Sequence, residues 1–235
     1  MQDNKQYYSD QEAKEMICEI GRRVYNRNYV AANDGNISVK VSPNEIWTTP
    51  TGVSKGYMNP DMMVKMDLSS KVLSGNLKPS SEVKMHLRVY NENPEVNAVV
   101  HAHPPVATSF AIAGIPLDKP VLPEAIVLLG NVPVAPYALP GTQEVPESIA
   151  PYCNTHNAVL LANHGALTWG RDLMEAYFRM ESLEHYATIL MYSNNILKKA
   201  NELNQSQITD LIKIRESMGI KAGGVPISEV DTEDE

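Results

Sequence analysis

At 235 residues and 26.0 kDa, the chain is long enough for one domain with a sizeable core. Hydrophobic residues make up 43% and charged residues 20%, as in ordinary globular proteins, and no apolar run has the length of a membrane span. The net charge is -8 and the lysines and arginines are not clustered, which argues against a nucleic-acid surface and favours small-molecule partners.

The first third of the chain predicts one helix followed by antiparallel strands. Ser9-Asp-Gln-Glu12 has the spacing of a capping box, and apolar residues follow it at helical intervals. Asn33-Asp-Gly-Asn36 predicts a turn, after which apolar and polar residues alternate as in half-buried strands. The predicted elements are a helix over 10–27 and strands over 37–41, 45–49, 64–68 and 71–73.

In the rest of the chain, helices alternate with short, strongly apolar strands. Pro79-Ser-Ser-Glu82 opens a helix that Asn93-Pro94 closes, and Asp172 caps a long helix with one apolar face. Helices are predicted over 79–93, 104–113, 147–152, 172–190 and 206–218, and extended segments over 96–103, 132–137, 157–163 and 166–169.

Because three of the strand pairs look like hairpins, we expect an α/β fold with a mixed, mostly antiparallel sheet covered by helices on both faces. No linker divides the chain, so we expect one domain over residues 1–220 and an acidic, flexible tail over 221–235. The N-terminus shows no export signal, and Cys18 and Cys153 do not suggest a disulfide framework. The expected compartment is the cytoplasm.

Two of the predicted strands run into histidines. His101 and His103 are two residues apart, so a strand turns both imidazoles to the same face, and His164 follows the strand over 157–163. Such histidines can simply be packed and hydrogen-bonded. Three imidazoles with an open position are typical of a catalytic zinc site, however, and Glu82 is the best candidate for a fourth, carboxylate ligand.

At this point the chain resembles the class II sugar-phosphate aldolase family, the group of L-fuculose-phosphate aldolase and ribulose-phosphate 4-epimerase. The resemblance extends from the first predicted helix to Tyr192, roughly four fifths of the chain, and consists of several motifs in family order. These motifs are Gly35-Asn36, Thr51-Gly52, Pro79-Ser-Ser-Glu82, His101-x-His103, Ala135-Pro-Tyr137, Gly141-Thr142 and Asn163-His-Gly165.

The resemblance implies a three-layer α/β/α sandwich and a homotetramer whose active sites lie at subunit interfaces. It also implies one divalent metal per chain, usually zinc, on His101, His103 and His164. The substrate phosphate would lie among backbone amides and hydroxyls, which suits an anion site in an acidic protein. The residues concerned are Gly35, Asn36, Thr51, Gly52, Ser80 and Ser81.

The implied reaction is reversible aldol cleavage of a ketose 1-phosphate, such as fuculose 1-phosphate or a 5-deoxy-pentulose 1-phosphate, to dihydroxyacetone phosphate and an aldehyde. In this reaction the metal stabilises the enediolate that is left when the carbon–carbon bond breaks. Glu82 would move protons on and off the dihydroxyacetone phosphate carbon, as the matching glutamate does in the aldolases of this family.

One departure from the family pattern keeps other activities open. L-fuculose-phosphate aldolase has a tyrosine in the stretch that corresponds to 121–125, where this chain has Glu124. Methylthioribulose-phosphate dehydratase uses a glutamate at a similar distance after His-x-His, and the 4-epimerase uses an aspartate there. Glu82 and Glu124 are therefore both candidate catalytic residues.

We prefer the aldolase because Glu82 lies in an intact Pro-Ser-Ser-Glu motif, whereas Glu124 is matched by spacing alone. A dehydratase or a pentulose-phosphate 4-epimerase remains an alternative. A binding module without catalysis, like the adducin heads, is disfavoured because the three histidines are retained.

Overall fold

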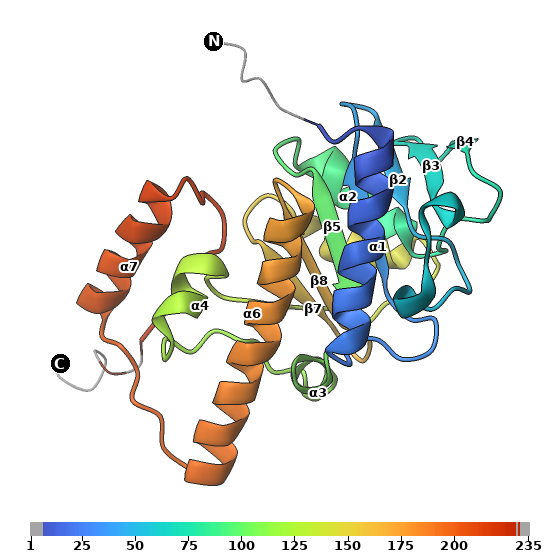
Figure 1. Cartoon of the computed structure of the whole chain (residues 1–235). Helices are drawn as coiled ribbons and strands as arrows, with labels where there is room; N and C mark the ends of the chain where they lie inside the picture. Colours follow the sequence, from blue (N-terminus) through green and yellow to red (C-terminus); the bar gives the residue numbers. More distant parts are fainter. Residues whose placement is uncertain (1–6, 229, 231–235) are drawn as a thin grey trace.

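The computed structural model describes residues 7–228 and 230, and these residues build a mixed sheet of eight strands in the order β4-β3-β2-β1-β5-β8-β7-β6 (Figure 1). Among the pairs of neighbouring strands, β6 and β7 are parallel and the others are antiparallel. The strands are β1 Asn36–Lys40, β2 Glu45–Thr48, β3 Val64–Asp67, β4 Val72–Ser74, β5 Ala98–Ala102, β6 Val134–Ala135, β7 Ala158–Leu161 and β8 Gly165–Gly170.

Helices cover both faces of the sheet, so the predicted three-layer α/β/α sandwich with a mixed, mostly antiparallel sheet is confirmed. One apolar core lies between the sheet and α1, α3, α4 and α6, and the other lies between the sheet and α2 and α5. The α-helices are α1 Asp10–Asn26, α2 Val83–Glu92, α3 Pro105–Ala113, α4 Pro123–Leu128, α5 Glu144–Ile149, α6 Leu173–Met191 and α7 Gln205–Ser217.

The helix ends follow the chemistry expected from the sequence. Ser9 and Glu12 form the capping box of α1, and the Asp172 side chain accepts a hydrogen bond from the Glu175 amide at the start of α6. The longest helix, α6, has 19 residues and includes several charged side chains. None of the helices in the described ranges combines the length and the hydropathy needed to cross a bilayer.

The register of the central strands brings the motif residues to one end of the sheet. Asn36, at the start of β1, lies directly opposite His101, near the end of β5. Ala102 of β5 lies opposite Ala166, at the start of β8. The turns that precede β1 and β8 and the turn that follows β5 therefore meet at this end, which is where the motif histidines lie.

The structure differs from the sequence-based prediction at the short helices. α4 was not predicted, because a segment of six residues beginning at Pro123 completes too few turns to show helical periodicity. α5 begins at Glu144, three residues before the predicted start at Glu147, and the turn after it is the 3-10 helix η3 Ala150–Tyr152.

The tail predicted to be flexible from residue 221 packs against the domain in its first part. The Asn157 side chain donates to the Ala222 carbonyl, and the Gly223 amide donates to Thr155. The Arg215 guanidinium donates to the Gly224 carbonyl, and Ser228 is buried. Backbone groups of 222–224 therefore have partners in the domain, and the division at 220/221 stays a prediction. Residues 229 and 231–235 lie outside the described residues.

Candidate metal centre and substrate cavity

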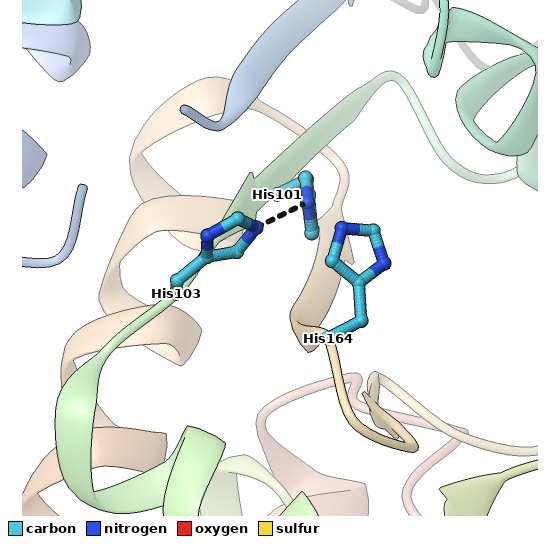
Figure 2. Close-up of side chains that lie close together, drawn as sticks. All are labelled: His101, His103 and His164. Carbon is cyan, nitrogen blue, oxygen red and sulfur yellow. Dashed lines mark hydrogen bonds between the residues drawn. The ribbon is translucent and has the colours of Figure 1, made fainter. Parts of the chain in front are cut away.

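Three histidine side chains converge at the end of the sheet where β5 stops (Figure 2). His101 belongs to β5, His103 follows it, and His164 lies in the turn between β7 and β8. The ring centroids are 4.8 to 5.1 Å apart, and the candidate ligand nitrogens all lie within 4.8 Å of one another.

The arrangement fits a tetrahedral divalent metal. Two ligand nitrogens at the usual zinc distance lie about 3.3 Å apart on a tetrahedral edge. The Nε2 atoms of His101 and His103 are separated by 3.1 Å. The Nδ1 atom of His101 lies 2.9 Å from the Ala166 carbonyl, to which it donates, and this leaves the Nε2 lone pair of His101 for a metal.

Burial favours the neutral form of His101 and His103, which is the form that binds a metal. It lowers the pKa of His101 well below its ordinary value, and the Glu82 carboxylate offsets this effect only in part. The pKa of His103 is also lowered, first by burial and then by the nearby His164. Neutral nitrogens at this spacing can bind a cation without first losing a proton.

Two glycines allow the three segments to approach so closely. A Cβ on Gly165 would lie 2.5 Å from Cδ2 of His103 and 2.7 Å from the Ala102 carbonyl oxygen. A Cβ on Gly35 would lie 2.8 Å from the His101 carbonyl oxygen, and Gly35 also has a φ of 74°. Larger residues would therefore separate the turns from the histidine strand.

Glu82 lies at the N-cap of α2 and faces the histidine cluster. Its Oε1 is 3.1 Å from Nε2 of His164, and its Oε2 is 3.6 Å from Nε2 of His101. Burial raises the pKa of this carboxyl, but the hydrogen bond with His164 acts in the opposite direction, and the pKa lies below its ordinary value. Glu82 is therefore a carboxylate, able to bind a metal or to accept a proton.

A column of buried polar side chains between β1 and α2 holds Glu82 in place. Asn36 donates from Nδ2 to Oε2 of Glu82 at 3.0 Å. Two residues further along β1, the Ser38 hydroxyl lies 2.7 Å from Nδ1 of His86 and 2.7 Å from the Tyr90 hydroxyl. Glu82, His86 and Tyr90 are one helical turn apart, so each turn of α2 is bonded to β1, and the rotation of the helix is fixed.

His86 is structural in this column. It is fully buried, and burial lowers its pKa to about 3, so the ring is neutral. Its ring is packed against β1 and is not exposed. The Ser38 partner could not be identified from the sequence, because β1 and α2 are more than 40 residues apart.

Beside the cluster lies a cavity of about 260 Å³ that is lined by most of the residues predicted to bind phosphate. Gly35, Thr51, Gly52, Ser80 and Ser81 line it together with Glu82, His103 and His164. The amides of Thr51 and Ser80 are already bonded to the carbonyls of Lys78 and Thr49, which hold the two loops side by side. The hydroxyls of these residues remain as neutral donors toward an anion.

Besides the buried His101, two predicted site residues do not line this cavity. The Asn36 side chain is buried against Glu82, so the structure gives it a role in placing the carboxylate. Glu124 is exposed on α4 and is not among the described residues that line the cavity.

Asp34 is a site residue that the motif analysis did not single out. Its Oδ2 lies 3.5 Å from Nδ1 of His103, the position of a carboxylate that orients a metal-binding imidazole. It lines the cavity and also a neighbouring cleft of about 720 Å³ between α3 and the loop after α1. Its place in the Asn33-Asp-Gly-Asn36 turn, just before motif residue Gly35, was the signal available in the sequence.

If the cluster binds a divalent metal, purified protein should contain about one metal ion per chain. His101→Ala and His164→Ala should each lose most of it, because two imidazoles hold zinc far less tightly than three. Elemental analysis after dialysis measures this. His185→Ala, which removes an exposed histidine of α6, is the matched control and should keep the metal.

The buried hydrogen bonds between β1 and α2 should stabilise the fold. Ser38→Ala removes the hydroxyl that His86 and Tyr90 share as a hydrogen-bond partner and should lower the free energy of unfolding by about 1–3 kcal/mol. Tyr90→Phe, which removes a single hydroxyl, should cost less. Urea denaturation measures both, with the exposed Ser69→Ala as control. An unchanged unfolding midpoint in Ser38→Ala would show that the column contributes nothing.

Comparison with known proteins agrees with the geometry. The model of the class II aldolase and adducin N-terminal domain family matches residues 15–191. A 3-oxo-tetronate 4-phosphate decarboxylase from Haemophilus influenzae is 33% identical over 208 residues, which cover 86% of this chain and 97% of the relative. An L-fuculose phosphate aldolase from Methanococcus maripaludis is 35% identical over 183 residues, 77% of this chain and 97% of the relative.

A solved structure of an L-fuculose 1-phosphate aldolase superposes with a TM-score of 0.81 at 28% identity, covering 92% of this chain and 99% of that one. The family model spans more than half of the chain, and the matched residues include the three histidines and Glu82. Enzymes of this family depend on a metal. The chain therefore belongs to the class II aldolase and adducin N-terminal domain family, as an enzyme of the class II aldolase type.

Proposed function

We propose that this protein cleaves a carbon–carbon bond beside the carbonyl of a phosphorylated ketose, releasing dihydroxyacetone phosphate and an aldehyde. The observation that carries the proposal is the ionised Glu82 carboxylate, which lies within 3.6 Å of two histidines of the cluster and lines the same cavity as the hydroxyl-rich loops. A proton-transfer group, a metal site and an anion site are what the reaction needs at neighbouring positions.

The residues have separate tasks in this proposal. Thr51, Gly52, Ser80 and Ser81 hold the phosphate, and this places the substrate carbonyl at the cluster. His101, His103 and His164 would hold a divalent metal, expected to be zinc, which would supply polarisation of that carbonyl and stabilisation of the negative charge left as the bond breaks. Glu82 begins as a base, takes a proton from the carbon of dihydroxyacetone phosphate in the condensation direction, and returns it during cleavage.

Decarboxylation of a 3-oxo acid phosphate is the second candidate, because relatives with this activity match most of the chain at 32–34% identity. This reaction was not among those predicted from the sequence. Loss of carbon dioxide from such an acid also leaves a negatively charged carbon beside a carbonyl, so the same site can serve both reactions. The difference lies in the departing group: cleavage to an aldehyde requires a base for a hydroxyl proton, whereas carbon dioxide leaves without one.

Glu124 is the candidate for the base that takes the hydroxyl proton when an aldehyde departs. Glu124 is exposed on α4 and does not line the cavity of its own chain, so it would act on a substrate in the cavity of a neighbouring copy. This agrees with the homotetramer with shared active sites that the family resemblance implies, and in that assembly Glu124 would exchange the aldehyde proton. A dehydratase or epimerase in which Glu124 acts within its own chain is less well supported, because Glu124 does not line the cavity.

The proposal predicts that metal-loaded protein exchanges a carbon-bound proton of dihydroxyacetone phosphate with deuterated water when no aldehyde is present. Glu82→Gln should slow this exchange by about 10²–10⁴-fold, because the amide cannot accept the proton. Glu124→Gln should exchange normally but cleave a ketose phosphate slowly. Proton NMR follows the exchange, and the reverse pattern in the two variants would reassign the base.

Product analysis distinguishes cleavage to an aldehyde from decarboxylation. Metal-loaded protein should convert a ketose 1-phosphate to dihydroxyacetone phosphate and an aldehyde, and it should do so faster than it releases carbon dioxide from 3-oxo-tetronate 4-phosphate. Coupled assay of dihydroxyacetone phosphate with both substrates gives the ratio of kcat/KM values. A ratio in favour of the 3-oxo acid would make the decarboxylase the function, and a dehydrated diketone would contradict both.

A further inference from the structure

A buried lysine lies behind the loops of the substrate cavity. Lys55 begins the 3-10 helix η1 Lys55–Tyr57, and its residue is 1% exposed. Its ammonium donates to the Asn33 carbonyl at 2.9 Å and to the Val53 carbonyl at 2.8 Å. A lysine is rarely buried so completely unless its charge has a purpose or a partner.

These two bonds join the loops that line one side of the cavity. Asn33, Asp34 and Gly35 belong to the first loop, and Thr51 and Gly52 belong to the second. The paired strands β1 and β2 bring the two loops to the same end of the sheet, and the bonds of Lys55 join the loops directly. Lys55 itself is not among the described residues that line the cavity.

The charge of Lys55 matters because the cavity itself is acidic. Asp34 and Glu82 line it, and no lysine or arginine is among the described lining residues. Lys84 donates to the Gly141 carbonyl near the rim, but its side chain is exposed, so water and salt screen its charge. A buried cation is screened much less and acts on a phosphate over a longer distance.

Lys55 keeps this charge at neutral pH. Burial lowers its pKa to about 8, and the carboxylates of Asp34 and Glu82 oppose that effect. The ammonium is therefore the main form at pH 7, and it donates to both carbonyls.

We propose that Lys55 is a positioning residue of the phosphate subsite, which ties the Asn33–Gly35 and Thr51–Gly52 loops together and places a buried positive charge behind them. The inference rests on the proposed function, because it takes the cavity to be the place where the substrate phosphate binds. In this acidic protein the buried Lys55 ammonium would then attract the phosphate together with the neutral donors of the loops.

The test compares three substitutions at one position. Lys55→Met removes the charge and both hydrogen bonds, Lys55→Gln keeps a donor without the charge, and Lys55→Arg keeps the charge. Binding of dihydroxyacetone phosphate to metal-loaded protein is measured by calorimetry. Proton exchange is measured with dihydroxyacetone phosphate and with unphosphorylated dihydroxyacetone. Lys65→Met, which removes a partly buried lysine on β3 that is paired with Asp10 and Glu45, is the matched control.

We expect Lys55→Met and Lys55→Gln to bind dihydroxyacetone phosphate roughly 10- to 100-fold more weakly, as loss of a poorly screened charge implies. For proton exchange, KM for the phosphorylated compound should rise more than kcat falls, and exchange into dihydroxyacetone should change less than about 2-fold. Lys55→Arg should recover most of the affinity. Metal content and the unfolding temperature of each variant show whether the site is still formed.

The outcomes separate this inference from the proposed function. If the unchanged protein neither binds dihydroxyacetone phosphate nor exchanges its proton, the proposed function is wrong. If it does both and Lys55→Met behaves like Lys65→Met, the role of Lys55 is wrong. The role of the charge would be overturned if Lys55→Met lost proton exchange equally with dihydroxyacetone and with its phosphate. It would also be overturned if Lys55→Gln bound dihydroxyacetone phosphate with full affinity.

Discussion

The candidate site depends on the close approach of three turns that are distant in the sequence. The end of β5 brings His101 and His103, the turn before β8 brings His164, and the turn before β1 packs against the His101 carbonyl. Gly35 and Gly165 permit this approach, because a methyl group at either position would overlap backbone or imidazole atoms. Protein interiors tolerate such overlap poorly, so the arrangement of the three histidines follows from steric fit.

The proposed substrate must bind against the negative charge of the whole molecule and of the cavity. The chain carries a net charge of -8, and its proposed substrate is an anion that must approach the Glu82 and Asp34 carboxylates. The divalent metal, the hydroxyl donors of the loops and the buried Lys55 ammonium together offset this repulsion in the proposal. Because charges in a poorly hydrated site are weakly screened, a few of them are enough.

The relatives act on different compounds, and the geometry gives a physical reason why one fold can serve them. Both the aldolase and the decarboxylase reactions need a polarised carbonyl, a held phosphate and a group that returns a proton to carbon. The histidine cluster, the hydroxyl-rich loops and Glu82 provide groups suited to these tasks within one chain. Under the proposed function, specificity would depend on what surrounds the departing group, such as the Asp34-lined cleft beside His103 or the exposed Glu124.

The sequence by itself determined the features that depend on local pattern. The Ser9 capping box, the alternation along β1 to β3 and the spacing of His101 and His103 each follow from the geometry of one helix or strand, and the mixed sheet between helices follows from their order. Tertiary structure alone decided which distant side chains meet. It turned Asn36 toward Glu82, bonded Ser38 to His86, placed Lys55 behind two loops and left Glu124 on the surface. Periodicity specifies which face of an element is buried, but not which residue of another element it will contact.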